Sequence, residues 1–153
     1  MKKLFILPVI IGMLVTGVYA ADKVKKDDDK NGNVSYAVIN QFKSDFRDAT
    51  NVNWTVTPNS QRAEFIVNGV KKSAFYNLDG TYLGTTQKVA YNTISLKAQK
   101  EIADKYIGYT VSEVIELQTG ESVDHFVDLK SAEGEVLVRV APTSAVYFFQ
   151  KVK

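Results

Sequence analysis

The sequence predicts an α+β protein in which one helix followed by a four-stranded antiparallel meander occurs twice in tandem, with the helices packed on one sheet face. Three observations lead to this fold class. Two amphipathic helical patterns lie about 60 residues apart, each precedes four short runs rich in β-branched and aromatic residues, and turn-forming residues separate the runs. The repeats are expected at about 35–88 and 93–151, and together they form one domain, 35–151.

The first 20 residues have the features of a secretory signal peptide. Lys2 and Lys3 precede an apolar run, and Val18 and Ala20 occupy the positions that signal peptidase reads. We expect cleavage near Ala20, a periplasmic or secreted location, and no membrane insertion of the mature chain. Removing Lys2 and Lys3 from the 19 Lys and Arg leaves 17, equal to the 17 Asp and Glu. This balance gives no electrostatic argument for a nucleic-acid partner.

Residues 21–34 are charged and polar, which predicts a flexible lead-in. Within them the stretch DDDKNGN is similar to the first half of a calcium-binding loop, with Asp27 at its first position and Gly32 at its turn. The twelfth position should carry a bidentate glutamate, and the chain has Val38 there. We therefore expect no specific calcium site, no metal and no cofactor.

The first repeat begins with a predicted helix over about 35–48. Ser35 is the expected N-cap, and an apolar stripe recurs every three or four residues, at Val38, Ile39, Phe42, Phe46 and Ala49. Strands are predicted at 52–57, 62–68, 70–77 and 81–87, with tight turns at Asn68-Gly69 and Asp79-Gly80. Strand alternation places Trp54 in the core.

The second repeat begins with a predicted helix over about 95–107 that ends at Gly108. Its apolar stripe consists of Ile94, Ala98, Ile102 and Tyr106. Four strands should follow, at 110–117, 122–129, 135–141 and 144–151. The two halves match in detail when residues 46–50 are set against 106–110 and Phe65 is set against Phe126.

Several segments carry a family resemblance. They are FKSDFRDATNVNW, EFIVNGVKKSAFYNLDGTYL and, in the second half, KAQKEIADKYIGYTVSEVIEL, whose helix ends in Tyr-x-Gly-Tyr. The chain resembles the exported PepSY-like, or beta-lactamase-inhibitor-like, family of Bacteroidetes-type bacteria. The matching positions are Phe46, Ala49, Thr50, Val52, Trp54, Ala74, Phe75, Tyr76, Asp79, Gly80 and Leu83.

The resemblance implies tandem helix-plus-sheet units, an extracytoplasmic location and, by analogy with exported inhibitors, a role in binding proteins. It brings no catalytic residues. Beta-lactamase inhibitor protein itself is held by disulfides, whereas this chain has no cysteine, so the similarity is architectural.

Candidate catalytic groups are few. The absence of cysteine excludes disulfides, thiolate metal sites and thiol nucleophiles. His125 is the only histidine, and the sequence has no second imidazole for a zinc site and no nucleophile motif beside it. We expect a structural His125 and no enzymatic activity. Alternation with Val123 and Val127 would bury it in part, whereas the match of Phe126 to Phe65 would turn it outward.

The sequence favours a non-enzymatic binding module that recognises a protein partner through the sheet face left uncovered by the helices. The expected contact residues mix arginine and tyrosine with one acid, and they are Arg62, Glu64, Tyr76, Arg139 and Tyr147. An ordinary solvated sheet face is the plain alternative. A different function, binding of a small ligand or metal in the groove between the repeats of an envelope protein, is the second hypothesis.

Overall fold

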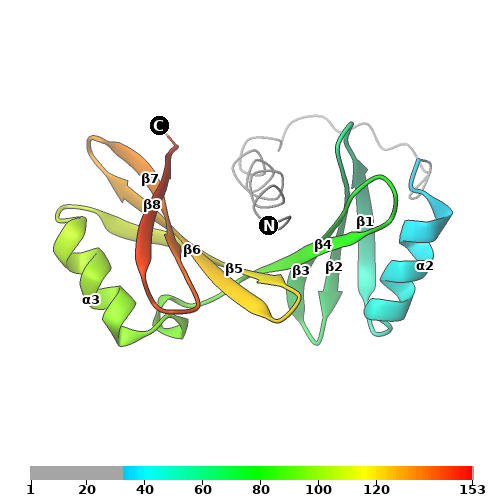
Figure 1. Ribbon diagram of the computed structural model, residues 1–153, viewed down its shortest axis with the longest axis horizontal. Coiled ribbons are helices and arrows are strands. Elements are labelled where there is room, and N and C mark those ends of the chain that lie inside the picture. The colour runs from blue at the N-terminus through cyan, green and yellow to red at the C-terminus, as the bar shows by residue number, and fades with distance from the viewer. Residues whose placement is uncertain (1–32, 153) are drawn as a thin grey trace. The chain divides into compact units, whose positions relative to one another are not determined.

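The computed structural model describes residues 33–152 (Figure 1). The elements in chain order are α2 (Tyr36–Asp45), β1 (Thr50–Val56), β2 (Gln61–Val67), β3 (Val70–Tyr76), β4 (Tyr82–Lys88), the short 3₁₀ helix η1 (Tyr91–Thr93), α3 (Leu96–Lys105), β5 (Thr110–Thr119), β6 (Ser122–Ser131), β7 (Gly134–Val140) and β8 (Val146–Lys151). The strands form one mostly antiparallel eight-stranded sheet in which β1 to β8 follow one another in chain order. The predicted signal peptide, its cleavage site and the calcium-like stretch as far as Gly32 lie outside the described residues.

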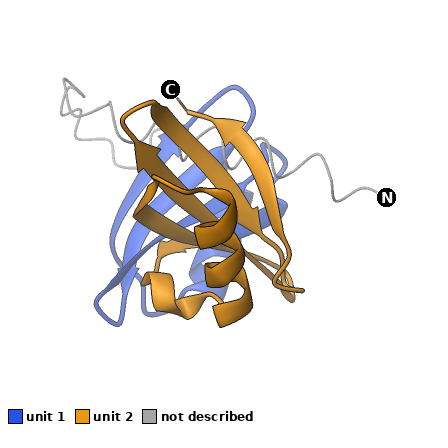
Figure 2. Cartoon of the chain, turned by 90° about the vertical axis from the view of Figure 1, so that its left-hand side faces the viewer, with its two compact units in different colours: residues 1–85 blue, residues 86–153 orange. Residues whose placement is uncertain are grey.

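The chain divides into two compact units, residues 1–85 and 86–153 (Figure 2). The division falls within β4, whose last residues belong to the second unit. Within the described residues, each unit contains one α-helix of ten residues and its own hydrophobic cluster. Within the described part of the chain, no helix has the length and apolar character that crossing a bilayer requires.

Helix α2 begins where the sequence predicts and ends earlier. The Ser35 hydroxyl accepts the Val38 N–H at 3.3 Å, which caps the first turn. Phe46 already has non-helical angles, φ −128° and ψ 65°, and donates its N–H to the Phe42 carbonyl. The apolar stripe continues beyond the helix because Phe46 and Ala49 pack on the same cluster from the following turn.

The core of the first unit lies between α2 and one face of its strands. Its buried members are Val38, Phe42, Ala63, Phe65, Ala74 and Tyr76. Trp54 packs edge-on against Phe42, with ring centroids 5.2 Å apart, so its predicted core placement is confirmed. Trp54 is partly buried at the edge of this cluster, whereas Phe65 is fully buried, and full burial of a side chain such as Phe65 contributes about 1.5–3 kcal/mol.

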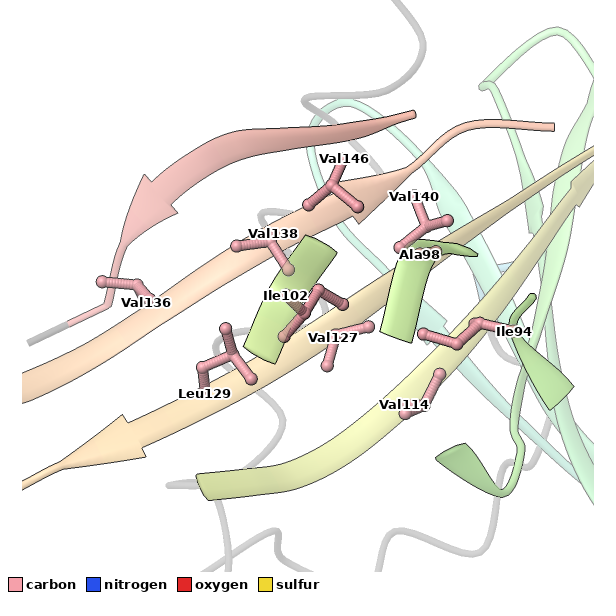
Figure 3. Packing of buried hydrophobic residues seen from close by; sticks show 10 residues of the cluster. All are labelled: Ile94, Ala98, Ile102, Val114, Val127, Leu129, Val136, Val138, Val140 and Val146. Carbon is pink, nitrogen blue, oxygen red and sulfur yellow. The ribbon is translucent and has the colours of Figure 1, made fainter. Parts of the chain in front are cut away.

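Helix α3 repeats the capping pattern and covers a more aliphatic core. The Ser95 hydroxyl accepts the Ala98 N–H at 3.2 Å, and Tyr106 leaves the helix at φ −116° and ψ 53°. The buried cluster consists of Ile94, Ala98, Ile102, Val114, Val127, Leu129, Val136, Val138, Val140 and Val146. Figure 3 shows Val127, Leu129 and Val138 from the strands gathered around Ile102 of α3.

The hairpin of β5 and β6 is longer than predicted. Both strands run for ten residues, and pairing reaches Thr119 opposite Ser122 because Gly120, at φ 61°, closes a two-residue turn. The predicted match of Phe65 with Phe126 is wrong. Phe65 lies in the cluster under α2, whereas Phe126 neighbours the helix-facing Val127 and so points away from α3.

Candidate functional site

In the first unit, the face turned away from α2 carries a loose group of charged side chains. Arg62 and Glu64 alternate along β2 with Ala63 and Phe65, which pack under the helix. The Arg62 Nη2 and Lys71 Nζ atoms each lie 3.8 Å from a carboxylate oxygen of Glu64. Arg62 and Glu64 are partly exposed, at 20% and 33% of their side chains, and ion pairs of this length near the surface contribute about 0–1 kcal/mol, so these contacts do not hold the two side chains firmly.

Tyr76 is not on this face, which corrects its assignment as a contact residue. Its side chain is fully buried and lies on the α2 side of β3, with ring centroids 6.3 Å from Trp54 and 5.7 Å from Tyr82. Burial, with the nearby Asp45 charge, raises the pKa of the Tyr76 hydroxyl well above its ordinary value. Tyr76 is therefore a neutral core residue.

Strand register explains the error. A two-residue turn at Asn68-Gly69 pairs Val67 with Val70, and counting back along the ladder sets Phe65 opposite Lys72 and Gln61 opposite Tyr76. Opposed residues in an antiparallel pair share a face, so Tyr76 follows Phe65 to the α2 side. The Asn68-Gly69 turn in the sequence therefore predicts the face that Tyr76 occupies. Alternation within β3 alone does not, because Phe75 and Tyr76 are both aromatic.

In the second unit, Arg139 is held firmly on the face turned away from α3. Its Nε and Nη2 atoms both lie 2.8 Å from Oδ1 of Asp124, whose side chain is only 4% exposed. Charge-assisted hydrogen bonds to a buried carboxylate are short and strong, so they fix the orientation of the guanidinium. About a third of the Arg139 side chain stays open to solvent.

Tyr147 lies directly opposite Arg139 in the β7–β8 ladder, and about half of it is exposed. On the same face Phe149 packs edge-on against the buried Phe126, with ring centroids 5.3 Å apart. The structure therefore brings two of the predicted contact residues, Arg139 and Tyr147, together on the sheet face where Phe126 and Phe149 pack. We call Arg139, Tyr147 and Phe149 the β7–β8 patch.

Sequence reasoning missed Asp124, the residue that anchors this patch. Arg139 pairs with Phe126 across β6 and β7, so Asp124 is its diagonal neighbour on the same face. Diagonal neighbours in a sheet are within reach of long side chains. Once the turn between β6 and β7 fixes their register, the sequence predicts that Asp124 and Arg139 are diagonal neighbours.

His125 lies on the α3 side of β6 and is partly buried, as strand alternation predicted. Its Nε2 atom lies 3.3 Å from Oε2 of Glu116, and the Gln87 amide donates to the other oxygen of Glu116 at 2.8 Å. Among residues 33–152 no group of three or more His, Cys, Asp or Glu side chains gathers as a metal site would require. The imidazole therefore lies beside the hydrogen-bonded side chains of Gln87 and Glu116, while its own Nε2 atom makes no hydrogen bond within the described residues.

Comparison with known proteins shows the fold. A BLIP-like protein from Bacteroides fragilis matches with a TM-score of 0.69 and 18% identity over 82% of this chain and 92% of that one. A DUF2874 family protein from Bacteroides uniformis gives a TM-score of 0.70 at 16% identity, covering 78% and 90% of the two chains. A Bacteroides eggerthii protein described as a candidate periplasmic protein gives 0.70 at 14% identity, with the same coverage.

The chain has the BLIP-like fold. At these identities the likeness extends to architecture and not to activity or partner. No protein-family model matches the sequence, and no curated protein matches it either.

Proposed function

We propose that the protein is an exported, non-enzymatic binding module of the PepSY-like type that recognises a protein partner through the sheet faces turned away from its helices. The observation that carries the proposal is the β7–β8 patch, in which a fixed, partly exposed arginine lies beside an exposed tyrosine. Arginine and tyrosine are enriched among the few residues that dominate the energy of protein interfaces.

The anchoring of Arg139 by Asp124 favours a role for Arg139 in binding a protein partner. A free arginine loses side-chain freedom when a partner immobilises it, at a cost of about 0.5–1.5 kcal/mol. Asp124 has already fixed Arg139 in the free protein, which lowers that cost. Arg62 and Glu64 of the first unit, which also point away from their helix, are proposed as additional contacts.

Export is part of the proposal. It is supported by the signal-peptide features of residues 1–20 and by the structural likeness to a candidate periplasmic protein of Bacteroides eggerthii. The absence of cysteine means that the exported chain depends on its two cores for stability rather than on disulfides.

We also infer that the two units are copies of one structural repeat, as the sequence predicts. The Ser35 and Ser95 hydroxyls cap α2 and α3 through the N–H group three residues later. The Thr50 hydroxyl donates to the Ile66 carbonyl at 3.3 Å, and the Thr110 hydroxyl donates to the Lys130 carbonyl at 3.2 Å. The serine and threonine donors and caps are therefore 60 residues apart in the two units, whereas the acceptors Ile66 and Lys130 are 64 apart because the hairpin of the second unit is longer.

The binding proposal is tested by capture of a partner from envelope extract with the exported chain, residues 21–153. Tyr147→Ala should abolish capture, whereas Phe148→Ala should keep it. Phe148 is the matched control because it is the next residue of β8, is also exposed, and pairs with Val138 on the α3 side. Equal capture by both variants, at unchanged melting temperature, would show that the β7–β8 patch is not the binding surface.

A further inference from the structure

The second unit contains a cavity of about 350 Å³ beside the start of α3. It is lined by Thr93, Ile94, Ser95, Glu121, Val123, His125, Val140, Ala141, Pro142 and Ser144. Ile94 and Val140, which mark one end of the core cluster in Figure 3, also form its inner wall. Among the side chains that line it there is no lysine or arginine.

In the first unit, a glutamine side chain occupies the equivalent place. Gln61 is 2% exposed, and its Oε1 atom accepts the N–H of the N-cap residue Ser35 at 2.9 Å. Its Nε2 atom donates to the carbonyl of Asn77, the residue after β3, at 3.3 Å. One carboxamide thus bridges the start of α2 and the end of β3.

The strand ladders establish that His125 takes the position of Gln61. Gln61 pairs with Tyr76, the last residue of β3, and His125 pairs with Val140, the last residue of β7. Both strands are followed by the same turn.

In the first of these turns, the Asn77 N–H donates to the Thr81 carbonyl, and the Asn77 carbonyl accepts the Gly80 N–H. In the second turn, the Ala141 N–H donates to the Ala145 carbonyl, and the Ala141 carbonyl accepts the Ser144 N–H. The fourth residue after each strand end also has positive φ, 95° at Gly80 and 67° at Ser144.

The second unit lacks the carboxamide bridge. His125 turns its Nε2 atom toward Glu116 instead. Within the described residues, the Ser95 N–H has no acceptor, and the Ala141 carbonyl accepts only the Ser144 N–H. Val140 stands where the first unit has the much larger Tyr76. An open space therefore coincides with one unpaired donor and one free acceptor site.

We propose that this cavity binds the primary carboxamide group of a ligand in the way that the Gln61 amide is bound in the first unit. The ligand oxygen accepts the Ser95 N–H, its NH₂ group donates to the Ala141 carbonyl, and its alkyl part packs on Ile94, Val123 and Val140. Ser95 is exposed and Ala141 is partly buried, and a single carboxamide would give each of these two backbone groups a hydrogen-bond partner.

Related head groups fit less well. A carboxylate can accept from Ser95 but cannot donate to Ala141, and the carboxylates of Glu116 and Glu121 repel it. An ammonium group can donate to Ala141 but leaves the Ser95 N–H unpaired. Of these three head groups, the carboxamide alone offers both a donor and an acceptor, as Gln61 does.

The test is an NMR titration of the ¹⁵N-labelled exported chain, residues 21–153, with isobutyramide. We expect a saturable shift of the Ser95 amide resonance, and about tenfold weaker or no binding of isobutyrate and isobutylamine. A second titration with the N-acetyl, N-methylamide derivative of glutamine distinguishes a small-molecule amide from a glutamine side chain of a peptide. No saturable shift with either amide, or equal shifts with isobutyrate, would overturn the proposal.

Two variants separate binding in this cavity from binding elsewhere. His125→Gln should rebuild the internal bridge, raise the melting temperature and abolish the shift of Ser95. Gln61→Ala should open the corresponding space in the first unit, lower the melting temperature, and make that temperature rise again on adding isobutyramide. Unchanged amide binding by His125→Gln would contradict the assignment, and this variant remains informative even if Gln61→Ala does not fold.

Discussion

At the scale of single residues, the face that a side chain occupies decides its role. Tyr76 and Tyr147 are both strand tyrosines, and the sequence predicted a contact role for both. Tyr76 is fully buried beneath α2, whereas Tyr147 is half exposed beside Arg139. The local pattern could not separate them because both β3 and β8 carry adjacent aromatic residues, and only the ladder register fixes which one faces the helix of its unit.

The buried hydroxyl of Tyr76 should make stability fall in alkaline solution. Its folded pKa lies above the value of 10.0 that the unfolded chain has, so its contribution is fully present below pH 10 and is lost as the pH rises through the folded pKa. Tyr76→Phe removes this group. Urea unfolding should show that the variant loses about 1.4 kcal/mol less than the wild type between pH 9 and pH 11. Equal losses would contradict the burial of this hydroxyl.

Asp124 should matter for stability as well as for the orientation of Arg139. Asp124→Asn removes the charge from two short hydrogen bonds at a nearly buried site. We expect a loss of about 1–3 kcal/mol in the free energy of unfolding, measured with urea. The matched control is Asp104→Asn, which breaks an exposed pair with Lys100 on α3 and should cost less than about 0.5 kcal/mol. A loss no larger than that of the control would mean that Arg139 is not anchored.

At the scale of elements, the sequence predicted the order and type of the helices and strands because their starts and turns have local chemical causes, whereas both helices end earlier than predicted, at Asp45 and Lys105. Serine caps begin both helices, and glycine or asparagine turns separate the strands of the hairpins. The error in matching Phe65 to Phe126 arose from the second hairpin. The paired Thr50 and Ile66 are 16 residues apart, whereas Thr110 and Lys130 are 20 apart. A single fixed offset between the halves therefore fails after β5.

The two helix caps give an element-scale prediction. Ser35→Ala and Ser95→Ala should each lower the free energy of unfolding by about 1 kcal/mol, because each removes the hydroxyl that accepts the first-turn N–H. Ser44→Ala, at an exposed position within α2, is the control and should be neutral or slightly stabilising. A cost at one cap without the other, in urea titrations of the three variants, would count against the equivalence of the two units.

At the scale of the whole molecule, the sequence predicted the α+β class and the antiparallel sheet, and the structural neighbours share that fold. The site was predicted in part. Arg139 and Tyr147 were identified by residue type and strand alternation, while Asp124, Phe149 and the cavity beside α3 depend on register between strands that no local pattern shows. That both helices cover one face of the complete sheet stays a prediction.

Contact of a protein partner with the β7–β8 patch can be measured by site-specific photo-crosslinking in the native envelope. Benzoylphenylalanine is placed at position 147 or, as the control, at position 148, two adjacent exposed positions on opposite faces of β8. We predict one covalent adduct of defined mass from position 147 and none from position 148. No adduct from position 147, or the same adduct from both positions, would contradict recognition through this face.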